Sequence, residues 1–311
     1  MKIYGDISEQ NIKTENGTAI AIGKFDGLHR GHRALIDLVT AEKVNGLVPA
    51  VFTFARAPRE HIGNERQKYI LTAAEKRIFM ENSGVDILVE QPLNDVIIST
   101  EPEDFIRDIL VGKLAVKKIF CGSDFRFGHK RLGDVQFLKK YESKYGYKTI
   151  VIDKLKYGQR DISSTFIREE IGKGSISLLN KLLGYPYTMF GTIVEGRRIG
   201  RTLDFPTVNI TPNEDKMLPP NGVYFTRAFI SGQVYEAITN IGVRPSVNVN
   251  GIVNVETHIL DFEENVYGET LELRFYEFVR TERKFDSLEE LKKAVHHDIA
   301  SRRLYVIHDQ K

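Results

Sequence analysis

The feature that most constrains the fold is a change in hydrophobic rhythm near Leu183. Before it, short apolar runs alternate with segments that carry apolar residues at helical spacing, and this alternation is typical of βαβ units and a parallel sheet. From Tyr187 onward the runs are short, closely spaced and rich in Val, Ile, Thr, Tyr and Phe, which favours a small antiparallel barrel. A length of 311 residues also favours two domains. We therefore predict an α/β parallel-sheet, Rossmann-like domain over 1–183 and an antiparallel β-barrel with a C-terminal helix over 184–311.

The expected elements follow from this periodicity. The strand-like runs of the first domain are Thr18–Ile22, Pro49–Phe54, Asp86–Val89, Lys118–Cys121 and Lys148–Ile152. The helical patterns between them are His32–Lys43, Ala73–Asn82, Glu103–Leu114 and Asp134–Tyr145. In the second domain we expect strands at Gly222–Ile230, Val253–Leu260 and Thr270–Phe278, a hairpin at Ser231-Gly232 and a closing helix at Leu288–Leu304.

Composition excludes several classes of protein. The apolar share of 41% is too high for a disordered chain, and the 44 Lys and Arg residues nearly balance the 42 Asp and Glu residues, which argues against a nucleic-acid partner. No apolar run is long enough to cross a bilayer, and the first residues lack the apolar core of a signal peptide. Cys121 is the single cysteine, so no disulfide can form within the chain. We expect a cytoplasmic protein without a membrane partner.

Two histidines and three glycines crowd into Gly23–His32, between an apolar run and a helical pattern. In parallel sheets, ligands bind where loops leave the carboxyl ends of strands, and the unpaired N–H groups of a helix N-terminus attract phosphate. His29 and His32 are three residues apart and can face the same side, which suits the charge that develops on a transferring phosphate. Asp26 can position a metal or a substrate hydroxyl. Two other interpretations remain at this point: hydrogen-bonded structural histidines, or a zinc site completed by Asp26.

A second cluster, Gly196–Ile210, combines a basic, glycine-containing loop with the sequence Pro-Thr-Val-Asn. Thr207 and Asn209 are two residues apart in an extended segment, so their side-chain oxygens lie on the same face. Oxygen ligands suit Mg²⁺, which shares its coordination with nucleotide phosphates. A charged β-turn followed by an ordinary strand end is the alternative for this segment alone.

Motifs in both halves resemble, in the same order, those of the bacterial bifunctional riboflavin kinase/FMN adenylyltransferases (FAD synthetases). The six motifs are Gly23–His32, Gly122–Asp134, Ile162–Arg168, Gly196–Ile210, Asn240–Ser246 and Val255–Phe262. The first also resembles the His-x-Gly-His signature of the nucleotidylyltransferase superfamily. The resemblance implies a nucleotidylyltransferase domain followed by a riboflavin kinase barrel.

The resemblance also implies site residues. In the first domain it makes His29 and His32 catalytic, and it gives ATP contacts to Gly23, Phe25, Asp26, Gly31, Ser164, Thr165 and Arg168. It gives the flavin contacts of this domain to Asp124, Phe125 and Arg126. In the barrel it makes Glu256 the base that takes the proton from the riboflavin 5′-hydroxyl, a role that suits a carboxylate. It assigns kinase ATP binding to Gly196, Gly200, Arg201, Thr207 and Asn209, and Mg²⁺ to Thr207 and Asn209.

The expected activity is FAD biosynthesis in two steps. The barrel phosphorylates riboflavin to FMN with Mg-ATP, and the first domain transfers AMP from ATP to FMN, which gives FAD and pyrophosphate. Two alternatives remain open: a riboflavin kinase whose adenylyltransferase half has decayed, and a flavin-sensing regulatory protein without turnover. The chain departs from the family pattern at Ala55-Arg56-Ala57, where relatives usually carry an acidic residue. An arginine there either favours reduced FMN, which carries more negative charge, or points into the solvent.

Overall fold

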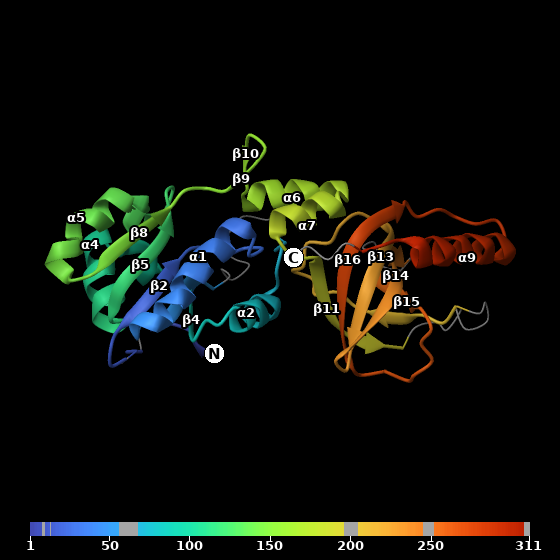
Figure 1. Cartoon of the computed structure of the whole chain (residues 1–311), viewed down its shortest axis with the longest axis horizontal. Helices are drawn as coiled ribbons and strands as arrows, with labels where there is room; N and C mark the ends of the chain where they lie inside the picture. Colours follow the sequence, from blue (N-terminus) through green and yellow to red (C-terminus); the bar gives the residue numbers. More distant parts are fainter. Residues whose placement is uncertain (8–9, 13, 56–67, 196–204, 245–251, 308–311) are drawn as a thin grey trace. The chain divides into compact units, whose positions relative to one another are not determined.

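The computed structural model describes residues 1–7, 10–12, 14–55, 68–195, 205–244 and 252–307 (Figure 1). The chain divides into two compact units. The first comprises residues 1–67 and 73–163, and the second comprises residues 68–72 and 164–311. This division falls after Ser163, whereas the predicted functional boundary falls after Leu183, so the boundary at 183 stays a prediction.

The first unit is built on a six-stranded sheet in the order β1-β4-β3-β2-β5-β8, and every neighbouring pair is parallel. The strands are β1 (Lys2–Tyr4), β2 (Thr18–Ile22), β3 (Val48–Phe54), β4 (Ile87–Gln91), β5 (Val116–Gly122) and β8 (Lys148–Ile152). The predicted α/β class is confirmed, and the edge strand β1 was not predicted. Every residue of β2 and β4 is buried, as expected for a sheet with both faces covered.

Helices and short hairpins connect these strands. The helices are α1 (Arg30–Ala41), η2 (Glu42–Asn45), α2 (Ala73–Asn82), α3 (Asp95–Ser99), α4 (Pro102–Asp104), the π-helix η3 (Phe105–Lys113), η4 (His129–Arg131) and α5 (Val135–Tyr145). The short strands are β6 (Arg126–Phe127), β7 (Gly133–Asp134), β9 (Lys156–Tyr157) and β10 (Arg160–Asp161). The predicted helix Glu103–Leu114 is thus divided between α4 and η3.

The strand order creates a switch point between β2 and β5. The chain passes from β2 to β3 on one side of it and adds β5 on the other side. Loops that leave the carboxyl ends of two such strands diverge and leave a crevice in which ligands bind. The two predicted ligand loops, which begin at Gly23 and Gly122, leave these two strands.

The second unit contains a closed antiparallel barrel in the order β11-β12-β15-β14-β13-β16. Its strands are β11 (Tyr187–Val194), β12 (Val208–Ile210), β13 (Gly222–Ile230), β14 (Gln233–Arg244), β15 (Ile252–Ile259) and β16 (Thr270–Arg280). The predicted hairpin at Ser231-Gly232 is confirmed, and both residues have positive φ, 50° and 81°, as a type I′ turn requires. Inside the barrel, the Thr239 hydroxyl lies 2.8 Å from that of Thr226 and 3.0 Å from that of Thr257.

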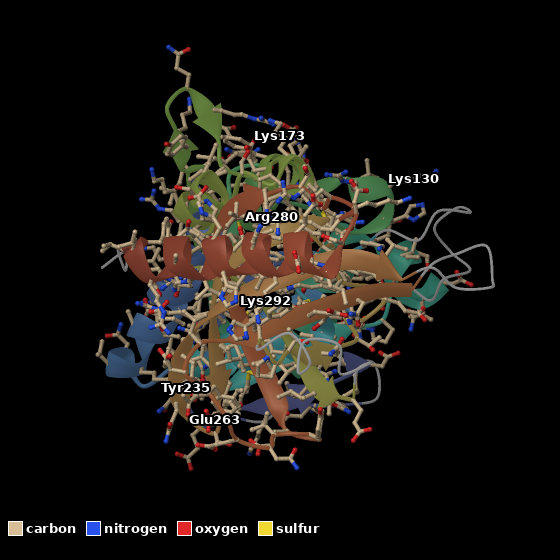
Figure 2. The ribbon with its side chains drawn as sticks, turned by 90° about the vertical axis from the view of Figure 1, so that its right-hand side faces the viewer. Lys130, Lys173, Tyr235, Glu263, Arg280 and Lys292 are labelled. Carbon is tan, nitrogen blue, oxygen red and sulfur yellow. The ribbon has the colours of Figure 1, made fainter. Side chains whose placement is uncertain are left out.

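The described part of this unit also contains the helices α6 (Ser164–Lys173), α7 (Ile176–Leu183) and α9 (Leu288–Leu304). The range predicted for α9 is confirmed, and Ser287 caps it by accepting a hydrogen bond from the Glu290 N–H. Arg280, labelled in Figure 2, lies at the end of β16. Its guanidinium pairs with the buried Asp298 of α9 at 2.8 Å. This ion pair links α9 to the last strand of the barrel.

A short piece from far upstream also belongs to the second unit. Tyr69 forms an isolated parallel bridge with Lys216, and its N–H donates to the Asp215 carbonyl at 2.7 Å. Lys216 is only 1% exposed, and its Nζ donates to the carbonyls of Ile70 and Thr188 at 2.9 and 2.7 Å. Residues 68–72 therefore belong to the second unit, and Ile70, Leu71 and Thr72 are buried. In the described part of the chain, no helix has the length and apolar character to cross a membrane.

Candidate active sites

The first candidate site is the loop that joins β2 to α1. The Gly23 N–H donates to the Phe52 carbonyl at 3.1 Å and extends the ladder between β2 and β3 by one bond. Beyond it, Phe25, Gly27 and Leu28 have φ angles of 47°, 86° and 39°. Non-glycine residues rarely adopt positive φ, and such conformations gather at ligand sites where the surroundings hold them in place. Phe25 and Leu28 are held because their side chains are buried.

A pair of stacked histidines stands where this loop enters α1. His29 occupies the N-cap position, and its ring stacks on that of His32 with centroids 3.8 Å apart and planes inclined by 20°. The centroid of the Phe25 ring lies 5.2 Å from that of the His32 ring. Both Nδ1 atoms are shielded from solvent and have no hydrogen-bond partner among the described residues. Burial lowers the pKa of His29 to about 4, although Asp26 opposes the shift, and burial together with His29 lowers the pKa of His32. Both imidazoles are therefore neutral at pH 7.

The start of α1 is open to an anion. Its first turn contains no acidic residue, and the N-cap side chain does not bond the backbone N–H groups there. A Cβ at Gly31 would lie 3.4 Å from the His29 ring, so glycine leaves free space beside that ring. N–H groups and imidazole donors can thus converge on one phosphate group. The structure brings together the predicted residues Gly23, Phe25, Asp26, His29, Gly31 and His32.

The predicted flavin loop follows β5. The Phe125 N–H donates to the Gly122 carbonyl at 3.0 Å, which closes a tight turn. The exposed Asp124 pairs with Lys154 at 2.8 Å, and this contact raises the pKa of Lys154. Arg126 pairs with Asp134 at 2.7 Å, and the half-buried Phe125 ring stacks on Phe127 with centroids 5.5 Å apart. The loop therefore offers an aromatic ring flanked by two ion pairs.

The second predicted nucleotide motif lies in the other compact unit. Ser164 and Thr165 begin α6, and Arg168 follows one turn later. The Arg168 Nη1 donates to the Lys68 carbonyl at 2.6 Å, within the second unit. The structure does not bring these residues together with the histidines inside one unit.

In the barrel, three polar side chains share one row across neighbouring strands. Asn209 on β12 lies directly opposite Glu256 on β15, which in turn lies opposite Asn240 on β14. Thr257 points into the barrel, so its neighbour Glu256 faces outward. Thr207, two residues before Asn209, is placed on the same side. The register thus brings the predicted residues Thr207, Asn209 and Glu256 to one site.

Asn254 fixes this row, and the sequence analysis did not single it out. Its Nδ2 donates to Glu256 Oε1 at 2.7 Å and to Asn209 Oδ1 at 3.0 Å. His258 Nδ1 lies 2.8 Å from the Pro206 carbonyl on the same face, and burial lowers its pKa. The sequence could have indicated Asn254, because Asn254, Glu256 and His258 alternate with apolar residues or threonine. A period of two places all three on the same face of a strand.

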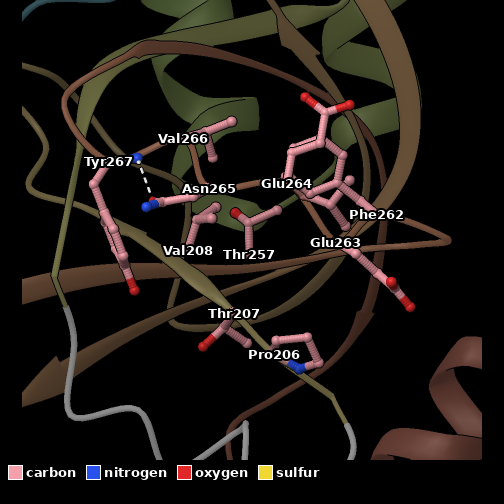
Figure 3. Close-up of a pocket in the computed structure, with 11 residues that line it drawn as sticks. Pro206, Thr207, Val208, Thr257, Phe262, Glu263, Glu264, Asn265, Val266 and Tyr267 are labelled. Carbon is pink, nitrogen blue, oxygen red and sulfur yellow. Dashed lines mark hydrogen bonds between the residues drawn. The ribbon is translucent and has the colours of Figure 1, made fainter.

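Two cavities meet at Thr207. One of about 380 Å³ is walled by Pro206, Val208 and the segment 262–267, where Phe262 and Tyr267 add aromatic surface (Figure 3). The other, of about 290 Å³, lies between the outer face of the barrel and α9. It is lined on the barrel side by Asn240, Glu256 and His258 and on the helix side by Leu291 and Val295. Thr207 lines both cavities, whereas Glu256 lines only the second.

Several predicted positions lie outside the described residues. They are Gly196, Gly200 and Arg201 of the basic loop, and Arg56 of the segment that departs from the family pattern.

Two family models match the chain in succession. The FAD synthetase model matches residues 11–166, and the riboflavin kinase model matches residues 183–306. The bifunctional riboflavin kinase/FMN adenylyltransferase of Haemophilus influenzae is 33% identical over 297 residues, which are 93% of this chain and 94% of the relative. Its namesake from Listeria monocytogenes is 35% identical over 283 residues, 89% of each chain. A crystal structure described as a macrolide-efflux protein from Streptococcus pneumoniae aligns with a TM-score of 0.87 and 26% identity, over 98% of this chain and 99% of its own.

Proposed function

Because the chain belongs to the family of bifunctional riboflavin kinase/FMN adenylyltransferases, we propose that the barrel and the parallel-sheet unit each carry one of its two reactions. The enzyme phosphorylates riboflavin to FMN with ATP, and it transfers AMP from ATP to FMN to form FAD and pyrophosphate. The alternatives of a kinase alone and of a non-catalytic flavin sensor are not favoured, because both catalytic models match one chain.

The kinase step is supported above all by the opposition of Asn209 and Glu256. We place the nucleotide in the 380 Å³ cavity and riboflavin in the 290 Å³ cavity, so that the phosphate crosses at Thr207, which lines both. The Glu256 carboxylate accepts the proton of the riboflavin 5′-hydroxyl as the hydroxyl oxygen attacks the γ-phosphorus, and ADP leaves. Asn254 holds the Glu256 carboxylate toward the row.

Mg²⁺ fits this place by the chemistry of its donors. The Thr207 hydroxyl and the Asn209 amide oxygen are neutral oxygen ligands, and Mg²⁺ takes few protein ligands while it shares the nucleotide phosphates. Asn254 orients Asn209 by donating to its Oδ1, which keeps a second lone pair. When bound, the ion neutralises charge on the transferring phosphoryl group.

The adenylyl step is assigned to the histidine loop. The FMN phosphate attacks the α-phosphorus of ATP and pyrophosphate leaves, so positioning and charge stabilisation suffice and no covalent enzyme intermediate is needed. His29, His32 and the N-terminus of α1 donate hydrogen bonds to the phosphate oxygens. Gly23, Phe25, Asp26 and Gly31 shape the nucleotide side of this loop.

Other contacts of the adenylyl step come from the remaining motifs. The flavin is assigned to the loop of Asp124, Phe125 and Arg126, which begins at the same switch point. The roles of Ser164, Thr165 and Arg168 in ATP binding remain part of this proposal on the strength of the motif. We also keep the cytoplasm as the proposed location, since the single cysteine, Cys121, suits a reducing compartment.

One incubation tests the proposal. The purified chain is mixed with riboflavin, ATP and Mg²⁺, and the flavins are separated by chromatography at successive times. We expect FMN first and then FAD. FMN as the sole product would contradict the assignment of adenylyl transfer. The absence of both FMN and FAD would contradict the assignment of both reactions.

A further inference from the structure

Thr53 touches the histidine loop without reaching the substrate side. It is the sixth residue of β3, its side chain is 0% exposed, and its Oγ1 donates to the Lys24 carbonyl at 3.0 Å. Lys24 stands between Gly23, which still pairs with β3, and Phe25, where positive φ begins. The hydroxyl is therefore bound to the last residue before the unusual backbone of the loop.

That backbone needs support from its surroundings. Phe25, Gly27 and Leu28 all have positive φ, and this conformation sets the direction from which the chain enters α1 at His29. Backbone of this kind persists only where neighbouring contacts over-determine it. The buried Phe25 and Leu28 side chains hold the far part of the loop, and the Thr53 hydroxyl holds its start.

We propose that Thr53 is a positioning residue for adenylyl transfer, which acts by fixing the Lys24 carbonyl and thereby the placement of His29 and His32. This inference rests on the proposed role of the histidines in that reaction. Thr53 does not touch the substrates itself, since its side chain is fully buried. We therefore expect its loss to lower the rate of the chemical step, because a small displacement of a catalytic group can reduce kcat strongly. Substrate affinity should change less.

Thr53→Val tests the inference, because valine keeps the shape and removes the donor. We expect kcat for adenylyl transfer to fall by about 10- to 100-fold, with a smaller change in KM for ATP and FMN. Kinase activity of the same protein should stay at the wild-type level. Thr53→Ser restores the hydroxyl and should recover most of kcat.

Thr18 offers a matched control in the same sheet. It is also fully buried, and its Oγ1 donates to the Leu114 carbonyl at 2.8 Å, at the opposite end of β2 from the loop. Thr18→Val should reduce thermal stability about as much as Thr53→Val while it leaves adenylyl transfer unchanged. Equal losses of adenylyl transfer in the two variants would mean that Thr53 is merely structural.

A double-mutant cycle with His29→Ala separates this inference from the proposed function. If Thr53 acts through His29, Thr53→Val should cost less than about twofold in the His29→Ala background. A full additional loss in that background would overturn the positioning role. Normal turnover of His29→Ala alone would instead overturn the role of His29, whereas a slow His29→Ala with a normal Thr53→Val would overturn only the inference about Thr53.

Discussion

His29 and His32 lie face to face, with ring centroids 3.8 Å apart, although each ring has a buried nitrogen without a partner among the described residues. Burying two imidazole nitrogens without hydrogen-bond partners lowers the stability of the fold. A bound polyanion such as ATP can accept hydrogen bonds from both rings, because a nearby negative charge favours donation.

The histidine pair predicts a selective loss. His29→Ala and His32→Ala should each lower kcat for adenylyl transfer by about 10²–10³-fold, because each removes one donor to the transferring phosphate. Phosphorylation of riboflavin by the same variants should remain near normal. Rates measured with FMN and with riboflavin as separate substrates provide the check, and a parallel decline of both activities would contradict the assignment.

The same pair predicts a pH dependence of stability. Burial lowers the pKa of His29 from 6.5 to about 4, so below pH 6.5 the unfolded chain binds more protons than the folded one. Stabilisation that is complete above pH 6.5 is then lost as the pH falls toward 4. When the pH falls from 7 to 5, the shifted pKa of His29 alone should lower the unfolding free energy by about 2 kcal/mol.

Urea unfolding at these two pH values measures this contribution. His29→Ala should show a smaller decrease in unfolding free energy than the wild type when the pH is lowered. The comparison of the two differences removes the general effect of protonating carboxylates and the cavity left by the substitution. Identical decreases in both proteins would show that His29 is not the responsible group.

Local patterns predicted much of the fold because its elements carry strong periodicity. The ranges of β2, β8, α2 and α9 agree with the predicted ones. The strand β1 has only three residues, Lys2–Tyr4, too few to establish an alternation. The inclusion of residues 68–72 in the second unit depends on Lys216, almost 150 positions further along the chain, and no local pattern reports such a contact.

At the candidate sites, too, local spacing predicted some relationships and the pairing of distant strands determined others. The spacing of His29 and His32 predicted that they share one side, and the structure confirms it. The opposition of Asn209 and Glu256 is a matter of strand register, which depends on how β12 and β15 pair across a long connection. The residue types pointed to Asn209 and the resemblance added Glu256, but only the register explains how they reach one site. Thr53 lies in the predicted strand Pro49–Phe54, but its hydrogen bond to Lys24 depends on how β2 and β3 pair, which no local pattern reports.

Glu256→Gln should separate the two activities in the opposite sense. Glutamine keeps an oxygen that can accept from Asn254, so the row is preserved while the base is lost. Kinase turnover should fall by about 10²–10⁴-fold, and FAD formation from supplied FMN should continue. Glu289→Gln removes an exposed carboxylate on α9 that lines neither cavity, and it serves as the control. A normal kinase rate in Glu256→Gln would mean that another residue is the base.

Lys216→Met should weaken the kinase unit. Methionine fills the space of the buried stem but leaves the carbonyls of Ile70 and Thr188 without their donor, which costs about 1–3 kcal/mol for each. It also removes the cation that lies 4.7 Å from the centre of the Tyr187 ring. Kinase activity should therefore disappear at a lower urea concentration, and Lys181→Met, on the exposed side of α7, should leave the midpoint unchanged.

The same contacts make a prediction for the isolated barrel. A piece that starts near Leu183 lacks residues 68–72, so the buried Lys216 Nζ loses the Ile70 carbonyl, and α6 and most of α7 are also absent. We expect this piece to phosphorylate riboflavin but to unfold at a lower urea concentration than the kinase of the full chain. In that piece Lys216→Met should be less harmful than in the full chain, because only the Thr188 carbonyl, and no longer the Ile70 carbonyl, loses its contact with Nζ. A midpoint equal to that of the full chain would show that residues 68–72 contribute nothing to the stability of the barrel.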